Sequence, residues 1–473
     1  MDQATNPTGP DSDAAAGPPG LFGGIFANGQ ATAETSDAAW LCALTDAEAA
    51  LARAQATVGL IEVDDAEAIA AACEPANFDP AELGALAASG GNPVIPLVKA
   101  LTAAVAGDAA RHVHKGATSQ DIMDTAAMLV SRRASAAILG QTGELTTQLA
   151  RLAHTYRDTP MAGRTLLQQA LPTTFGAVAA GWLHAIGTAA ARLAEVARHR
   201  LAAQLGGAAG TLASLGDAGP AVATAYAGEL GLAEPTLPWH TDRGRVADLA
   251  GALGELSGTV GKVARDITLL AQTEVGEVSE VGGAGVGGSS TLPHKRNPVA
   301  AVAALACAQR TPGQVTTLLA AMVQEHQRAA GAWHSEWPAL NDLLGTTGSA
   351  VAWLETSMRR LQVAPQRMRA NLDLTGGLLL AERVTTALAP QLGRATAHEQ
   401  VQAACAEAAE TGHDLADTLA WRLAGQRTRD DIARLLEPDG YLGSAGVFVD
   451  RALAAHRERG RPNVGGPWRE AAR

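Results

Sequence analysis

The sequence is poor in aromatic side chains and in lysine. Aromatic residues make up 3% of the 473 residues, whereas hydrophobic residues make up 47%. An interior with few large rings is built mainly from alanine, leucine and valine, which suits close packing of helices. Lysine occurs only at positions 99, 115, 262 and 295, so arginine supplies nearly all positive charge. A lone lysine is usually a solvated surface residue, but a lysine inside a loop is unusual in this chain.

Several classes of partner are excluded by what is missing. The net charge of −12 argues against nucleic acid or an anionic membrane as the main partner, because phosphate binding needs clustered Lys and Arg. No apolar run reaches membrane-spanning length, and no basic segment followed by an apolar one suggests secretion. The four cysteines, at 42, 73, 307 and 405, show no metal-binding spacing. We therefore expect a cytoplasmic protein without metal, membrane or nucleic-acid partners.

Helical periodicity dominates the chain and predicts an all-α fold. Long helices are expected over about residues 121–156, 173–203 and 246–278. In the third, Leu256, Val260, Val263, Ile267 and Leu270 form the apolar seam of a bundled helix. The helical period is expected to continue from Val299 through His326, beyond Pro312. No strand pattern is evident.

The length and the changes in composition predict several domains. Residues 1–34 are rich in Pro, Gly and Ala and are expected to be a mobile tail. They precede a helical domain over 35–110, a central long-helix bundle over 111–360 and a C-terminal helical domain over 361–473. In the last domain, Thr396 and Glu399 read as a capping box opening a helix that Gly412 closes.

One glycine-rich loop separates two of the predicted helices. Residues 282–298 read GGAGVGGSSTLPHKRNP, so a segment without side chains is followed by a dense run of donors and cations. The loop is not a nucleotide-binding P-loop, because the Gly-Lys-Ser/Thr ending and a preceding strand are missing. The G-x-S-x-G elbow of serine hydrolases is also absent.

Two further segments combine polar side chains with the start of a predicted helix. Residues 112–125, HVHKGATSQDIMDT, can hold a carboxylate through helix N–H groups, Lys115 and the hydroxyls of Thr118 and Ser119. Alternatively, Thr118 and Asp121 only cap the helix. Residues 163–176, GRTLLQQALPTTFG, offer Arg164 for a bidentate carboxylate contact, with Gln168 or Gln169 to orient it. Alternatively, Arg164 forms a surface ion pair and the threonines are caps.

A third segment, residues 324–337, contains Gln324, Arg328, Trp333 and Glu336. Arg328 is a candidate contact for an anionic group. The simpler interpretation is a helix end with a satisfied histidine and packed tryptophans.

Three of these segments resemble the signature regions of one enzyme superfamily, in its order. SSTLPHKRNP at 289–298 closely resembles GSSxMPxKxNP of the fumarase/aspartase superfamily, with Leu292 where methionine is usual. The segments at 114–121 and 163–176 resemble its other two signatures. Residues 204–211, 238–243, 272–277, 371–377 and 441–444 resemble its bacterial branch that lactonises carboxylated muconates. The resemblance covers about residues 36–455 and implies a three-domain all-α subunit with a central long-helix bundle.

The resemblance also implies a reaction and its residues. A cycloisomerase of this branch adds one carboxylate of a small polycarboxylate substrate to a conjugated double bond, in the protocatechuate branch of aromatic degradation. Ser289 is the implied proton-transfer residue, and Lys295 with loop N–H groups would stabilise its alkoxide and the developing enolate. The implied substrate-binding residues are His114, Thr118, Ser119, Arg164, Gln168, Ser290, Asn297 and Arg328. No cofactor is expected, because the reaction needs only proton transfer and electrostatics.

Leu166 separates the alternatives within the superfamily. Adenylosuccinate lyase usually has a catalytic histidine directly after its GRT, which protonates the leaving group, and Leu166 stands there. An enzyme that closes a ring has less need of that acid. A fumarate-releasing lyase and a non-catalytic homologue remain as alternatives, although the presence of Ser289, Lys295 and Asn297 argues against the latter. The resemblance further implies a homotetramer whose active sites are each built from three subunits.

Overall fold

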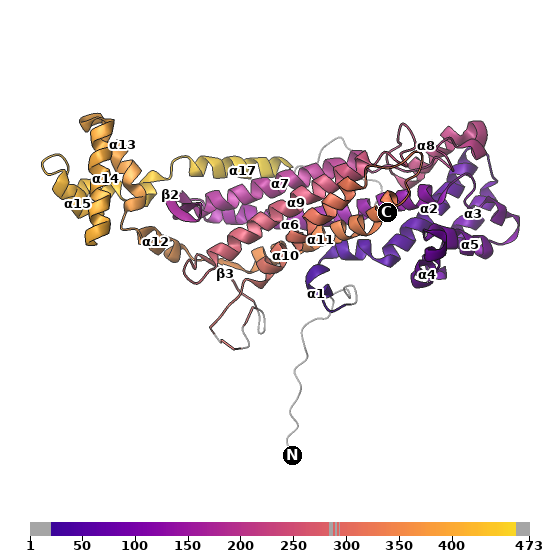
Figure 1. Ribbon diagram of the computed structural model, residues 1–473, viewed down its shortest axis with the longest axis horizontal. Coiled ribbons are helices and arrows are strands. Elements are labelled where there is room, and N and C mark those ends of the chain that lie inside the picture. Colours follow the sequence, from indigo (N-terminus) through magenta and orange to yellow (C-terminus); the bar gives the residue numbers. More distant parts are fainter. Residues whose placement is uncertain (1–19, 283–286, 289–290, 293, 460–473) are drawn as a thin grey trace, which may run out of the picture. The chain divides into compact units, whose positions relative to one another are not determined.

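The computed structural model describes residues 20–282, 287–288, 291–292 and 294–459, and most of this chain is helical (Figure 1). The predicted all-α class is confirmed. The described chain divides into two compact units. Unit 1 holds residues 20–142, 189–262 and 303–354, and unit 2 holds 143–188, 263–302 and 355–459. The predicted domain boundaries at residues 34, 110 and 360 differ from the boundaries of these two units, and the predicted domains stay a prediction.

The long helices contribute residues to both units. They are α6 (Ser119–Thr155), α7 (Phe175–His199), α9 (Gly244–Leu270), α10 (Val299–Ala320) and α11 (Ala332–Arg360). The predicted seam of α9 is confirmed, because Leu256, Val260, Val263, Ile267 and Leu270 are all buried. The prediction that the helix after the loop continues through His326 is wrong: α10 includes Pro312 but ends at Ala320, and His326 has a left-handed φ of 50°. Among the described residues, no helix is both long and apolar enough to span a membrane.

The remaining helices of unit 1 are shorter, and some of them share a small core. They are α1 (Gly23–Phe26), η1 (Gln30–Thr35), α2 (Asp37–Thr57), α3 (Val63–Ala72), η2 (Pro75–Asn77), α4 (Pro80–Gly90), α5 (Val94–Ala104), η3 (Gly107–His112), η4 (Ala213–Ala218) and α8 (Gly219–Leu230). Ser36 caps α2 by accepting a hydrogen bond from the Ala39 N–H at 3.2 Å. Ala49, Ile69 and Leu101 belong to one buried cluster that joins α2, α3 and α5. This core fixes α2 against the turn that precedes α6.

Part of the predicted tail is ordered. Residues 1–19 lie outside the described residues, but α1 and η1 begin before the expected boundary at residue 34. The Trp353 indole donates to the Ile25 carbonyl at 2.8 Å, and the Asn28 N–H donates to the Ser349 hydroxyl at 3.0 Å. These contacts attach the segment to α11 at Ile25 and Phe26, one of the two apolar pairs in the tail, with Leu21 and Phe22, that are expected to be able to dock.

Unit 2 contains two small antiparallel sheets that the sequence did not predict. Strands β1 (Pro160–Thr165) and β2 (Gln168–Thr174) form a hairpin, and β3 (Val278–Glu280) pairs with β4 (Leu361–Val363). Leu166 and Leu167 form the two-residue hairpin turn at φ values of 50° and 64°. The sequence shows no strand pattern here, because these strands are too short and too mixed in composition to show alternation.

The last part of unit 2 is a cluster of short helices. They are α12 (Pro365–Asp373), η5 (Leu378–Leu380), α13 (Ala381–Leu392), α14 (Arg394–Thr411), α15 (Leu415–Arg422), α16 (Arg429–Leu435), η6 (Pro438–Tyr441) and α17 (Ala445–Arg459). Leu388, Val401 and Leu419 lie in a core shared by α13, α14, α15 and α16. Gly412 ends α14 in a left-handed conformation, as predicted. The capping box expected at Thr396 is wrong, because α14 begins earlier, after Gly393; a capping box occurs instead at Thr428 and Asp431.

Candidate active site

The turn before α6 is held by one fully buried carboxylate, Asp121. Its two oxygens accept hydrogen bonds from the backbone N–H groups of Thr118 (2.9 Å), Gly206 (2.9 Å) and Gly207 (2.8 Å). The His240 Nε2 lies 2.7 Å from the same group. Thr118 and Asp121 thus form the predicted helix cap, but Asp121 also ties α6 to two distant segments. This arrangement fixes the hydroxyls of Thr118 and Ser119 at the helix N-terminus.

His114 is held in the same turn from α2. Its Nδ1 lies 2.7 Å from the Glu48 Oε1, and Glu48 is 2% exposed. Burial lowers the pKa of His114, but the charge and the hydrogen bond of Glu48 outweigh burial, so that the pKa is raised overall. The His114 ring is therefore oriented and favoured as a cation.

A pocket of about 290 Å³ brings three of the predicted site residues together. Its polar side is formed by His114, Thr118 and Ser119, and its apolar side by Val94, Ile95, Val98 and Ala117. The Asn92 amide donates to the Ser119 hydroxyl at 3.3 Å, while its carbonyl oxygen caps α5 by accepting from the Val94 N–H at 3.1 Å. Two hydroxyls, an imidazole oriented by Glu48 and a helix N-terminus form a suitable site for a carboxylate on an apolar carbon skeleton.

Arg328 lies beside this turn. Its Nη1 donates to the Thr118 hydroxyl oxygen at 3.2 Å and its Nε donates to the Gln120 side-chain oxygen at 3.0 Å. The remaining nitrogen, Nη2, is buried and has no hydrogen-bond partner among the described residues. A buried guanidinium N–H without a partner is costly, so a bound carboxylate oxygen would stabilise it.

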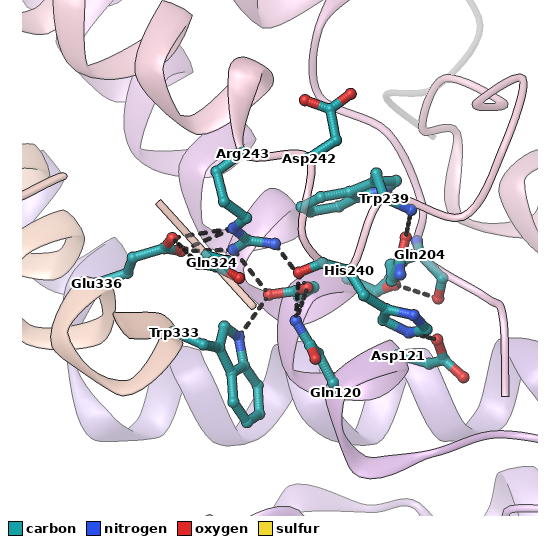
Figure 2. A network of polar contacts seen from close by, with 12 residues as sticks. Gln120, Asp121, Gln204, Trp239, His240, Asp242, Arg243, Gln324, Trp333 and Glu336 are labelled. Carbon is teal, nitrogen blue, oxygen red and sulfur yellow. Dashed lines mark hydrogen bonds and ion pairs between the residues drawn. The ribbon is translucent and has the colours of Figure 1, made fainter. Parts of the chain in front are cut away.

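Behind the turn lies a buried ion network that the sequence analysis missed (Figure 2). The Arg243 guanidinium binds Asp124 at 2.9 and 3.0 Å and reaches Glu336 at 2.5 Å. The Trp333 indole donates to Asp124 at 3.0 Å, and Gln324 donates to Glu336 at 2.9 Å. Burial raises the pKa of Glu336, and Arg243 opposes this shift. The network anchors the segment that carries Arg328 to the first turns of α6.

The interpretation of residues 324–337 as packed tryptophans is correct in part. Trp333 is buried and stacks edge-on against Trp337 with ring centroids 4.8 Å apart. Its neighbour Glu336, however, belongs to the ion network. Arg243 and Glu336 each follow a tryptophan by three or four residues, but nothing in the sequence pairs these two segments.

In unit 2, Arg164 is engaged by a buried glutamate. Its two terminal nitrogens donate to the Glu277 carboxylate at 2.9 and 2.7 Å, and Glu277 is fully buried. The Asn371 amide donates to the same carboxylate at 2.7 Å, and Gln169 donates to the Asn371 carbonyl at 2.9 Å. The alternative of an ion pair is thus observed, although its partner is buried. Binding of a substrate carboxylate by Arg164 stays a prediction, as does the role of the exposed Gln168.

The glycine-rich loop is described only in part. Ser289 and Ser290, predicted for proton transfer and substrate binding, lie outside the described residues. The Asn297 backbone and side-chain N–H groups both donate to the Gly287 carbonyl, at 2.9 and 3.2 Å. Gly287 has a φ of 69°, and a Cβ there would lie 2.7 Å from the Asn297 carbonyl oxygen. Lys295 is exposed.

The two ends of this loop are joined by a contact that the sequence did not predict. The Glu280 carboxylate accepts from the backbone N–H groups of Ala300 and Ala301 at the start of α10, and from the Ser357 hydroxyl at 2.6 Å. The loop is therefore anchored on the scaffold on both sides.

The described residues contain no group of three or more His, Cys, Asp or Glu side chains that could hold a metal ion. Each unit carries part of the predicted site. Unit 1 contributes His114, Thr118, Ser119 and Arg328, and unit 2 contributes Arg164, Gln168, Lys295 and Asn297. An all-α fold with hydroxyls, an imidazole and an arginine gathered at a helix N-terminus is compatible with a helical lyase that acts on carboxylates.

Comparison with known protein families identifies the family of this chain. A family model described as lyase matches residues 27–313, and a model of the adenylosuccinate lyase C-terminus matches residues 377–452. The chain belongs to the lyase family of the fumarase/aspartase superfamily, and it is an enzyme of that superfamily.

Individual relatives resemble nearly the whole chain. A 3-carboxy-cis,cis-muconate cycloisomerase of Pseudomonas aeruginosa is 46% identical over 445 residues, 93% of this chain and 97% of that protein. A nitrosuccinate lyase of Streptomyces davaonensis is 44% identical over 466 residues, 96% of this chain and 97% of that protein. The crystal structure of 3-carboxy-cis,cis-muconate lactonizing enzyme from Pseudomonas putida is 42% identical, with a TM-score of 0.87, and covers 93% of this chain and 99% of that one.

Proposed function

We propose that this protein is a cycloisomerase that converts 3-carboxy-cis,cis-muconate to 4-carboxymuconolactone. The proposal depends chiefly on the 46% identity to a cycloisomerase of that name over 93% of the chain. The pocket in unit 1 supports it, since it offers two hydroxyls and the His114 imidazole, whose pKa Glu48 raises, to a carboxylate beside an apolar wall.

The reaction requires one carbon–oxygen bond and one proton transfer. A carboxylate oxygen of the substrate adds to the conjugated double bond, and a proton is delivered to the carbon next to another carboxylate. We assign the proton to Ser289. Lys295 would lower the pKa of that hydroxyl and stabilise the enolate-like carboxylate as negative charge develops. His114, Thr118, Ser119 and Arg328 would bind the carboxylates, together with Arg164, Gln168, Ser290 and Asn297.

We further propose a cytoplasmic homotetramer with active sites shared between subunits. The free thiols Cys42, Cys73, Cys307 and Cys405 fit a reducing compartment. Sedimentation at assay concentration tests the assembly: a fully active monomer would exclude shared sites.

Leu166 argues against one group of alternatives, but not against all of them. It is 97% exposed at the hairpin tip and cannot donate a proton. An amine or amide leaving group, such as that of adenylosuccinate, needs a proton in order to leave. Nitrite, in contrast, is the anion of a moderately strong acid and leaves without one.

Nitrosuccinate lyase is therefore the second candidate. The nitrosuccinate lyase relative is 44% identical against 46% for the cycloisomerase, and its alignment is the longer one, at 466 against 445 residues. Loss of nitrite from nitrosuccinate would leave fumarate, with Ser289 acting as the base that removes the proton next to a carboxylate.

Parallel assays separate these reactions. Purified protein is incubated with 3-carboxy-cis,cis-muconate, nitrosuccinate and adenylosuccinate in separate reactions. We expect loss of diene absorbance with the first, and neither nitrite nor fumarate from the others. Nitrite release without diene loss would replace the proposal by the second candidate, and turnover of adenylosuccinate would overturn both.

A further inference from the structure

Helix α2 presents two buried polar side chains to the turn that carries His114. Glu48 and Gln55 lie seven residues apart, which is two helical turns, so they share one face with the buried Leu44 and Leu51. Glu48 reaches the His114 Nδ1 at 2.7 Å, and the Gln55 amide donates to the Lys115 carbonyl at 2.7 Å. Two polar side chains on an otherwise apolar helix face therefore contact two successive residues of one turn, His114 and Lys115.

The turn they hold has an unfavourable backbone conformation. His114 has a φ of 57°, in the left-handed region that non-glycine residues rarely adopt. Such a conformation is unfavourable and persists only where the surroundings impose it. The contacts from Glu48 to His114 and from Gln55 to Lys115 help to hold the turn in this conformation.

The ring of His114 has one nitrogen engaged by Glu48 and one that remains for another partner. Because Nδ1 faces Glu48, Nε2 is the nitrogen that can serve a molecule in the 290 Å³ pocket that His114 lines. Glu48 from α2 and Asp121 from α6 both favour the charged imidazole. The residues of α5 that line the pocket, Val94, Ile95 and Val98, carry no charge.

A neutral partner would be sufficient if the only role of Glu48 were to hold the turn. Gln55 performs that role through an amide on the same helix. A buried carboxylate has a desolvation cost that an amide avoids, and the ion pair with His114 is what compensates for it.

We propose that Glu48 is a positioning residue of the active site: it orients the His114 ring and holds it as a cation, so that the Nε2–H group donates to a substrate carboxylate. This inference depends on the proposed function for the identity of the bound carboxylate. The orientation and charge of the ring can be measured without any substrate.

The first test is an NMR titration of histidine labelled with ¹³C in the ring, with the His114 signal assigned by its loss in His114→Asn. We expect His114 to titrate above about 6.5, the ordinary value for histidine, and to titrate lower by about one unit in Glu48→Gln. An unchanged titration in that variant would overturn the inference. If Glu48→Gln does not fold, the wild-type protein decides: a His114 pKa at or below about 6.5 overturns it.

The matched control is Gln55→Leu, which removes a buried tie to the same turn and leaves Glu48 in place. It is expected to reduce stability while His114 titrates as in the wild-type protein. Equal shifts in both variants would mean that Glu48 acts only through the turn and would contradict the proposal.

Kinetics provide the second readout. With 3-carboxy-cis,cis-muconate, Glu48→Gln should raise KM about tenfold with little change in kcat, and KM should begin to rise at lower pH than in the wild-type enzyme. In the His114→Asn background, Glu48→Gln should change neither quantity further. A pH profile unaltered by Glu48→Gln would overturn the inference. If the wild-type protein does not turn over 3-carboxy-cis,cis-muconate, the proposed function is contradicted. The NMR titration of His114 then decides the role of Glu48 on its own.

Discussion

The Glu280 carboxylate accepts a hydrogen bond from the Ala300 N–H at 3.0 Å and thereby joins the two ends of the glycine-rich loop. The same carboxylate accepts from Ala301 at 2.9 Å and from the Ser357 hydroxyl at 2.6 Å. Negative charge at a helix N-terminus interacts favourably with the helix dipole. The two ends of the loop are thus held on one support by Glu280.

Glu280→Ala should therefore affect both stability and turnover. Loss of the N-terminal acceptor of α10 is expected to lower the free energy of unfolding by about 1–2 kcal/mol. Because the loop loses its anchor, kcat should fall about tenfold or more. Urea unfolding and steady-state kinetics measure the two effects. Glu280→Gln, which keeps one acceptor, should lie between Glu280→Ala and the wild-type protein; an alanine variant as active as the wild-type protein would refute the anchoring role.

The Arg243 network predicts a large loss of stability. Arg243→Met would leave Asp124 and Glu336 buried side by side without their cation. Breaking a buried ion pair by removing one partner typically costs about 3–5 kcal/mol. Chemical unfolding measures the loss. The exposed pair of Arg192 and Glu255 provides the control, since Arg192→Ala should cost less than about 1 kcal/mol. Similar losses in the two variants would show that the network contributes little.

The Glu48 and His114 pair predicts a pH dependence of stability. The folded-state pKa of His114 is raised above its unfolded value of 6.5. The stabilisation is therefore fully present below the unfolded pKa and is lost as pH rises through the folded-state pKa. The difference in unfolding free energy between the wild-type protein and Glu48→Gln should be constant below about pH 6.5 and should shrink above it. A difference that grew with pH would contradict the assigned charge on the ring.

The sequence predicted those parts of the fold that depend on local pattern. The seam of α9 and the end of α14 at Gly412 follow from periodicity and from the conformational freedom of glycine, both of which are visible in a few neighbouring residues. The β1–β2 hairpin could not be predicted, because two leucines occupy a turn that normally requires Asn or Gly.

The buried ion pairs that hold the candidate site could not be predicted from local sequence patterns. Asp121 meets His240 across 119 residues, and Arg164 meets Glu277 across 113 residues. Asp121 and Glu277 both lie in segments that resemble known motifs. A motif, however, does not show which residue a buried carboxylate will pair with. Arg164 illustrates the consequence: its type and position suggested a substrate ligand, and the structure shows a guanidinium already paired with Glu277.

Progress curves with 3-carboxy-cis,cis-muconate, run in parallel for the wild-type protein, Ser289→Ala and Lys295→Met, test the central claim most directly. The wild-type protein should remove the diene absorbance over many turnovers and yield the lactone. Both variants should remain folded by circular dichroism yet lose turnover by about a factor of 100 or more, because the proton donor or the cation that activates it is gone. Absence of turnover in the wild-type protein at saturating substrate, or near wild-type turnover in Ser289→Ala, would contradict the account.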